Sequence, residues 1–203
     1  MNLTRSKKKD LLYVAVAAFF FLTACVLQTV DDYISDWSVK KTIALLTQYI
    51  FFGLLAYWTA SVISRISDKS ICSGIIVAIA LMGMILFVRL LKYHVFYEET
   101  ATRYLWYSYY IPQCIAPVVL LLTILGMGRK DGKPLAKGWY LLFLPAAALI
   151  LLVFTNDLHE QVFSFAKGLK YSNEIYKWEW GYYFILSWMV GLYLSIGVLL
   201  YVK

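Results

Sequence analysis

Six runs of this sequence contain no charged residue and are each long enough to cross a lipid bilayer as a helix. A membrane-spanning helix needs about 20 consecutive apolar residues to cross a hydrocarbon core roughly 30 Å thick. The runs cover residues 11–30, 42–64, 70–88, 104–128, 138–156 and 181–202. With 62% hydrophobic and 15% charged residues, the chain is also too apolar for a soluble domain. We therefore expect an all-α integral membrane protein with six transmembrane helices, formed by residues 1–203 as a single polytopic domain.

Basic residues are concentrated at one end of the predicted helices. The two termini and the connections 65–69 and 129–137 together carry eleven basic and three acidic residues, whereas the opposite side carries eight basic and nine acidic residues. Because cytoplasmic segments are enriched in Lys and Arg, this distribution predicts that both termini are cytoplasmic. The net charge of +7 is then explained by orientation and by contact with anionic lipid, so we expect membrane lipid and no nucleic acid as a partner.

The longest connection lies on the other side, between the fifth and sixth predicted helices. Residues 157–180 alternate apolar and polar side chains on both sides of a turn-rich middle, residues 168–173. This pattern predicts a short extracytoplasmic β-hairpin, in which residues 161–165 pair with residues 175–180. An irregular amphipathic loop on the lipid headgroups is the alternative.

Three prolines interrupt the fourth and fifth predicted helices. Pro112 and Pro117 lie in the fourth helix and Pro145 in the fifth. Each removes a backbone hydrogen-bond donor, so we expect kinks at these positions. A kink can open space between helices, and a cavity near Pro112 is one expected result.

One face of the fourth predicted helix is rich in hydrogen-bond donors. Arg103, Tyr107, Tyr110 and Cys114 follow one another at spacings of four, three and four residues, which places them on a common helix face. A guanidinium followed by two phenol hydroxyls suits an anionic or carbonyl-bearing ligand. The alternative is an interfacial belt, in which Tyr side chains lie at headgroup level for solvation alone.

A polar cluster, Thr-Asn-Asp-Leu-His-Glu, ends the fifth predicted helix at residues 155–160. Asn156 and His159 are three residues apart and share one side if the helix continues, with Asp157 beside them. Two interpretations stay open. These side chains either contact a ligand, or Asn156 and Asp157 end the helix while His159 bonds to the hairpin backbone.

Arg89 closes the third predicted helix, where an unpaired guanidinium near hydrocarbon is costly. We expect Arg89 to extend to the interface or to meet a carboxylate, with Glu98, Glu99 and Asp157 as candidates.

The residue types that membrane enzymes use are scarce. The chain has two histidines, His94 and His159, both at one end of the predicted bundle, whereas zinc hydrolases generally need three protein ligands. None of the six runs contains Asp or Glu, which also argues against a proton-coupled transporter. We expect no enzymatic activity, no cofactor and no metal. The cysteines, which we expect to be small membrane-buried residues without a disulfide, are Cys25, Cys72 and Cys114.

The region from residue 103 to residue 188 resembles a known family. A proline-bearing span, a short basic turn and a span that ends in Thr-Asn-x-x-His before a hairpin resemble the N-terminal multi-span sensor domain, of seven-transmembrane type, of bacterial membrane histidine kinases. The matching positions are Pro112, Thr155, Asn156 and His159. The resemblance implies signal reception at the extracytoplasmic face of a bacterial cytoplasmic membrane, with transmission to a cytoplasmic output. Three spans precede the matching region, and one span follows the Thr-Asn-x-x-His motif. The family pattern leads us to expect fewer spans before the region and more spans after the motif. The chain carries no phosphoacceptor-histidine segment and no ATP-binding boxes, so the output is expected elsewhere.

The leading hypothesis is a non-enzymatic sensory domain that binds a small-molecule signal and relays it to a cytoplasmic output, a kinase or a transcriptional protein. This output is either a further domain, if the chain is a fragment of a longer protein, or a separate partner. A homodimer is one expected assembly. The alternatives are a small transporter or channel subunit and a membrane-embedded lipid-modifying enzyme. The candidate ligand-binding residues are Arg89, Arg103, Tyr107, Tyr110, Asn156, Asp157, His159, Trp178 and Trp180.

Overall fold

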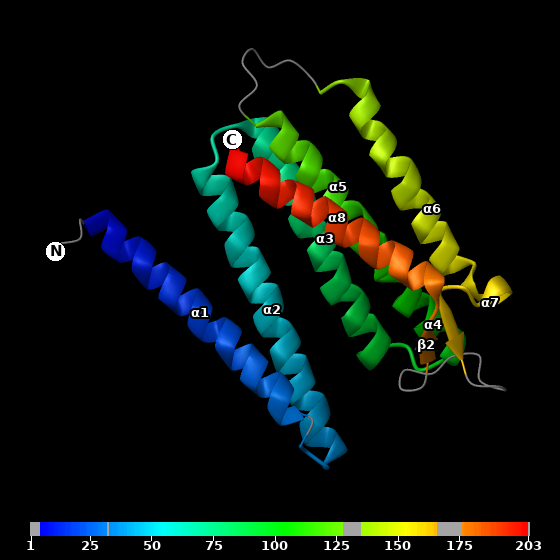
Figure 1. Ribbon diagram of the computed structural model, residues 1–203. Helices are drawn as coiled ribbons and strands as arrows, with labels where there is room; N and C mark the ends of the chain where they lie inside the picture. Colours follow the sequence, from blue (N-terminus) through cyan, green and yellow to red (C-terminus); the bar gives the residue numbers. More distant parts are fainter. Residues whose placement is uncertain (1–4, 32, 128–134, 166–175, 203) are drawn as a thin grey trace. The chain divides into compact units, whose positions relative to one another are not determined.

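Six helices of the computed structural model are long and apolar enough to cross a membrane (Figure 1). The structure describes residues 5–31, 33–127, 135–165 and 176–202. The six candidate spans are Tyr13–Val30, Ser38–Arg65, Lys69–His94, Glu99–Gly126, Lys137–Phe154 and Trp180–Val202. They confirm the six predicted helices, and with them the all-α, multi-pass membrane fold.

The chain divides into two units, Met1–Ser61 and Val62–Lys203. The first unit contains α1 (Arg5–Asp31) and most of α2 (Trp37–Arg65). Asp36 caps the start of α2, because its Oδ1 accepts hydrogen bonds from the backbone N–H groups of Ser38 (2.8 Å) and Val39 (3.1 Å).

The second unit is arranged around one central helix, α5. The elements of this unit are α3 (Lys69–His94), α4 (Glu99–Ser108), α5 (Tyr110–Gly126), the 3-10 helix η2 (Lys137–Leu142), α6 (Phe143–Phe154), α7 (Asn156–His159), β1 (Phe163–Phe165), β2 (Tyr176–Trp178) and α8 (Trp180–Val202). Helix α5 contacts α3, α6 and α8. Half of the most apolar 18-residue stretch of its span is buried, against 17% or less in each other span. The other helices therefore use α5 as their common packing surface.

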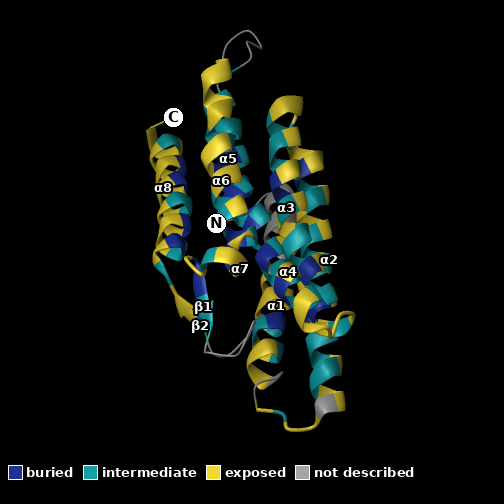
Figure 2. Ribbon diagram, turned by 90° about the vertical axis from the view of Figure 1, so that its right-hand side faces the viewer, coloured by how far each residue is buried: buried dark blue, intermediate teal, exposed yellow. Residues whose placement is uncertain are grey.

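Close helix contacts on α5 depend on small and polar groups. A Cβ added at Gly74 of α3 would overlap the side chain of Thr123 on α5, so the absence of a side chain lets the two helices approach. On the other side, Trp188 of α8 donates its indole N–H to the carbonyl oxygen of Cys114 at 3.3 Å. The outer sides of α6 and α8 are exposed and carry leucines such as Leu144 and Leu194, as expected of surfaces that face lipid (Figure 2).

Proline explains why the fourth span consists of two helices. Pro112 has no N–H to donate to the carbonyl of Ser108, and α4 ends at Ser108 while α5 begins at Tyr110. Tyr109 between them keeps helical dihedral angles (φ −59°, ψ −29°), so the interruption is local. Pro112 itself is fully buried, and it does not line the cavity between the start of α3 and the end of α5 that is described below.

Two short strands follow α7 and pair antiparallel. Phe163, Ser164 and Phe165 of β1 lie opposite Trp178, Lys177 and Tyr176 of β2. Both strands fall inside the segments that the sequence predicts to pair, and the predicted turn-rich middle, residues 168–173, lies outside the described residues.

The start of α8 continues this pairing. The backbone N–H of Glu179 donates to Val162 O at 3.0 Å, and that of Gly181 donates to Gln161 O at 2.9 Å. A Cβ at Gly181 would lie 2.8 Å from Gln161 O and 3.1 Å from a methyl carbon of Val162. Helix α8 therefore meets the strand segment at a position where only glycine fits.

Replacing this glycine is expected to destabilise the second unit. Gly181→Ala places a methyl group against backbone that cannot rotate away, at a cost of about 1–3 kcal/mol in the free energy of unfolding. Gly191→Ala is the matched control, because it lies in the same helix with no atom within 4 Å of an added Cβ. Thermal unfolding in detergent should show a lower Tm for Gly181→Ala alone. Equal Tm values for both variants would contradict the close approach.

Candidate functional site

The end of α6 turns at Thr155 and leads into the short helix α7. Thr155 has φ −94° and ψ 7°, and its hydroxyl donates to Leu151 O at 2.7 Å. After the four residues of α7, Glu160 adopts a left-handed conformation (φ 49°, ψ 29°). These two changes of direction carry the chain from the membrane-spanning helix into β1 and place Asn156 and Asp157 between them.

The side chain of Asn156 binds the backbone of β1. Its Oδ1 accepts hydrogen bonds from the N–H groups of Val162 (2.9 Å) and Phe163 (3.0 Å). Its Nδ2 donates to Phe163 O at 2.9 Å and to the hydroxyl of Tyr107 at 3.4 Å. A side-chain amide offers two donors and two acceptor positions, so all four are used. Asn156 is also completely buried (0% exposed) and has no capacity left for a ligand.

The neighbouring carboxylate of Asp157 collects three donors from α4. Arg103 approaches Oδ2 with its Nη2 at 3.0 Å, and the hydroxyl of Tyr107 donates to Oδ1 at 2.7 Å. The hydroxyl of Tyr104 donates to Oδ2 at a longer distance, 3.5 Å. The side chains of Arg103 and Asp157 are 10% and 25% exposed, so the guanidinium is largely withdrawn from solvent while the carboxylate keeps contact with it. The hydrogen bonds to the carboxylate are charge-assisted. We call the five residues the Asp157 cluster: Arg103, Tyr104, Tyr107, Asn156 and Asp157.

The donor-rich face predicted for the fourth span points into the protein. Arg103, Tyr107, Tyr110 and Cys114 are all buried, with Tyr107 at 0% and Tyr110 at 8% exposure. The ring of Tyr110 contacts Phe163 of β1, with 5.6 Å between the ring centroids. Burial to this degree distinguishes Tyr107 and Tyr110 from an aromatic belt at the headgroups, whose rings would face outward.

His159 closes the turn after α7. Its Nδ1 accepts a hydrogen bond from the N–H of Gln161 at 2.9 Å, and its Nε2 lies 3.2 Å from the hydroxyl oxygen of Thr155. Because the Thr155 hydroxyl donates its hydrogen bond to Leu151 O, its oxygen can accept a hydrogen bond from the N–H at Nε2. Gln161 belongs to the predicted hairpin segment, so these contacts correspond to the structural interpretation of His159.

Three predicted site residues lie outside the Asp157 cluster. Arg89 is exposed on α3 and forms no ion pair with a carboxylate in the described part of the chain. Trp178 is half exposed and stacks on Tyr182 at 4.7 Å, and Trp180 packs against Phe184 at 5.5 Å. Both Trp rings thus lie against α8.

The pairing of Arg103 with Asp157 and the contribution of Tyr104 did not follow from the sequence. A guanidinium on a buried helix face needs an opposite charge. The sequence signal for this pair is the combination of Arg103 on the donor-rich face of the fourth span with Asp157 at the end of the fifth.

A cavity of about 240 Å³ lies at the other end of the second unit, between the start of α3 and the end of α5. Its lining includes Asp68, whose Oδ1 already accepts hydrogen bonds from the N–H groups of Ser70 (2.8 Å) and Ile71 (3.1 Å) at the start of α3. The carboxylate therefore acts as a helix cap there.

The described residues were compared for side chains that could together hold a metal ion. Among residues 5–31, 33–127, 135–165 and 176–202, no group of three or more His, Cys, Asp and Glu side chains is close enough to hold a metal ion. The Asp157 cluster combines one carboxylate with donors that bind it. Such an arrangement can hold an anion.

Comparison of the sequence with protein-family models, with curated proteins and with solved structures gives no match. The function proposed below therefore rests on the contacts of the Asp157 cluster and on the sequence pattern.

Removing the Asn156 amide is expected to destabilise the second unit strongly. Asn156→Leu would leave the N–H groups of Val162 and Phe163 buried without their acceptor, so the free energy of unfolding should fall by about 3–5 kcal/mol. The matched control is Gln161→Leu, an exposed amide in the same turn, which should change it by less than about 0.5 kcal/mol. Thermal unfolding and amide hydrogen exchange at residues 162 and 163 measure the effect. Unchanged protection of these amides in Asn156→Leu would show that the amide does not hold β1.

Proposed function

We propose that the chain is a non-enzymatic transmembrane sensory domain and that the Asp157 cluster receives its signal. The observation that carries this proposal is the convergence of Arg103, Tyr104 and Tyr107 on one carboxylate. These donors form an anion-binding site, and the anion in it belongs to the protein. The signal is then a small molecule with a carboxylate or similar anionic group that replaces Asp157 on Arg103.

The position of Asp157 gives such a replacement a mechanical consequence. Asp157 lies on the four-residue helix α7, next to Asn156, which holds β1. Release of Asp157 would therefore loosen α7 and the strand pair from α4. Since α4 leads directly into α5, and α5 contacts α3, α6 and α8, a change at α4 can alter the helix arrangement at the far end of the unit. A ligand shifts this equilibrium only by its difference in affinity for the two arrangements.

The charge distribution and the family resemblance support the direction of signalling. Eleven basic residues against three acidic ones favour cytoplasmic termini, which puts the Asp157 cluster at the extracytoplasmic side of a bacterial cytoplasmic membrane. The resemblance of Thr155, Asn156 and His159 to the sensor domains of histidine kinases favours a kinase or transcriptional partner as the output.

The orientation can be tested directly. A peptide tag at either terminus should be inaccessible to an antibody in intact spheroplasts and become accessible after permeabilisation, because both termini are expected in the cytoplasm. A cysteine introduced at Glu160 should react with an impermeant maleimide in intact spheroplasts. The opposite labelling pattern would place the Asp157 cluster on the cytoplasmic side.

The proposal predicts that the protein's own carboxylate competes with external anions. In nanodiscs at constant ionic strength, Asp157→Asn should bind acetate or phosphate at least about tenfold more tightly than the unmodified protein, because an internal competitor that fills the site more than about 90% of the time is removed. Thermal stabilisation by each anion, with chloride as the reference, measures this affinity.

Two further variants separate an anion site from a structural ion pair. Arg103→Gln should abolish the stabilisation by anions. Glu160→Gln makes the same change of charge as Asp157→Asn at an exposed neighbouring position and should leave the affinity unchanged. If Asp157→Asn gains no affinity for any anion, or if Arg103→Gln retains it, the cluster is a structural connection only.

A further inference from the structure

His159 joins α7 to the strand segment through a hydrogen bond whose direction is fixed. Its Nδ1 lies 2.9 Å from the backbone nitrogen of Gln161, and a backbone N–H can only donate. Nδ1 must therefore offer a lone pair, so the ring proton of the neutral imidazole is on Nε2, where it points to the hydroxyl oxygen of Thr155. This geometry suits the neutral ring and not the ring that carries a proton on both nitrogens.

Protonation of the imidazole breaks one of these two contacts and keeps the other. In an imidazolium both ring nitrogens are donors, so an N–H at Nδ1 would face the N–H of Gln161 with only 2.9 Å between the nitrogens. The contact of Nε2 with Thr155 persists, because Nε2 already donates in the neutral ring. The charged ring therefore stays attached to the end of α6 and loses its hold on the strand segment.

The main chain of Gln161 extends this change to α8. Its carbonyl oxygen accepts a hydrogen bond from the N–H of Gly181 at 2.9 Å, so Gln161 binds His159 on one side and the first turn of α8 on the other. The next two residues of the segment, Val162 and Phe163, have their N–H groups on Asn156 instead. Among these hydrogen bonds, the one that can be lost by protonation is the one that leads to α8.

The charged groups around His159 do not offset this loss. On α7 itself, Asp157 is bound by Arg103 and two Tyr hydroxyls of α4. Helix α6, which contacts α7, has no titratable side chain, and neither has β1. Beyond β1, Glu179 accepts a hydrogen bond from Ser164 at 2.6 Å. Glu160 follows His159 in the chain and is exposed, so its attraction for an imidazolium is weakened by solvent.

We propose that His159 is a proton sensor that controls the connection between α7 and the start of α8. Histidine is the side chain that changes its charge between about pH 5 and 8. The closed turn excludes a proton that the open turn accepts, so the connection is present at neutral pH and is lost as the pH falls. The proton is the only ligand that this response needs, and it does not depend on anion binding at the Asp157 cluster.

Amide hydrogen exchange of the full chain in detergent micelles tests this proposal. The protection factors of the Gln161 and Gly181 amides, corrected for the intrinsic exchange rate, should both fall about fivefold between about pH 8 and pH 5, the factor that corresponds to one lost hydrogen bond. His159→Asn should remove this dependence, because the Asn side-chain oxygen accepts the N–H two residues further on and does not titrate. The matched control is His94→Asn, which removes the other histidine of the chain and should keep the dependence.

Three results would overturn the proposal. The first is equal protection of Gln161 at both pH values in the unmodified protein, and the second is a pH dependence that survives in His159→Asn. Loss of protection at Gln161 without loss at Gly181 is the third, because it would refute the connection to α8. If His159→Asn does not fold, the imidazole nitrogen chemical shifts of the unmodified protein at about pH 8 decide, since a ring proton on Nδ1 would contradict the hydrogen bond from Gln161.

Discussion

The side-chain amide of Asn156 is the contact on which the extramembrane end of the second unit depends. In an antiparallel pair, alternate residues of an edge strand direct their N–H and C=O groups away from the partner strand. Phe163 of β1 has both of these groups on Asn156, which therefore takes the place of a neighbouring strand. Because Phe163 is completely buried, water cannot supply these hydrogen bonds, and without the amide the cost of burying the strand edge would be uncompensated.

The adjacent residue, Asp157, joins the same turn to the membrane-spanning part of the chain. A guanidinium withdrawn from water is tolerated only if its charge is matched, and Asp157 supplies this match to Arg103 at 3.0 Å. Asn156 and Asp157 thus bind two different elements, β1 and α4, through one four-residue helix. The strand pair and the fourth span cannot separate unless the hydrogen bonds of Asn156 or the ion pair between Arg103 and Asp157 break. A ligand at the cluster, as proposed above, would act on the helices through this linkage.

The sequence predicted the parts of this site that depend on local periodicity and missed those that depend on helix ends. The spacing from Arg103 to Cys114 indicates neighbours on one face of the span, and the structure buries that face although it divides the span into α4 and α5. The pairing of Arg103 with Asp157 joins residues far apart in the chain and depends on the turn at Thr155 and the left-handed conformation of Glu160. Propensity assigns neither conformation in advance, because Thr and Glu have no strong preference for these regions of φ and ψ. The six spans were predictable since uncharged runs of that length have few other stable structures.

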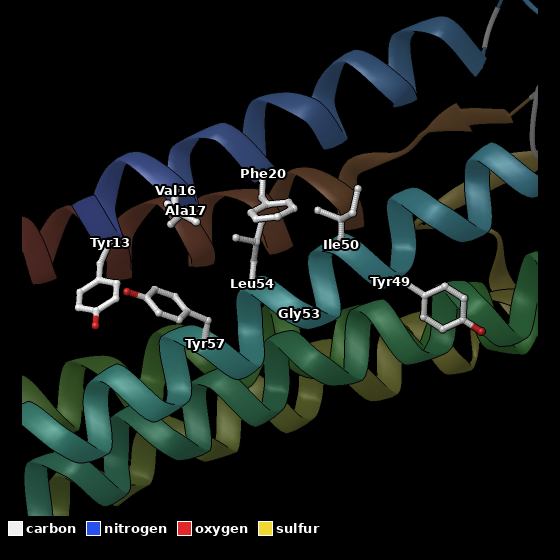
Figure 3. Close-up of a pocket in the computed structure, with 9 residues that line it drawn as sticks. All are labelled: Tyr13, Val16, Ala17, Phe20, Tyr49, Ile50, Gly53, Leu54 and Tyr57. Carbon is white, nitrogen blue, oxygen red and sulfur yellow. The ribbon is translucent and has the colours of Figure 1, made fainter. Parts of the chain in front are cut away.

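The role of a glycine cannot be predicted from the sequence, because it depends on what lies beside the glycine in the fold. At Gly74 the missing side chain is replaced by Thr123 of the next helix, and at Gly181 by the backbone of Gln161, so both positions bring elements together. At Gly53 nothing takes its place, and the same residue type leaves room beside an apolar groove that α1 and α2 line (Figure 3). In water such a space would favour closer packing of α1 on α2, because apolar surface would be removed from solvent. In a bilayer this driving force is absent, and helices associate through van der Waals packing and hydrogen bonds between them instead.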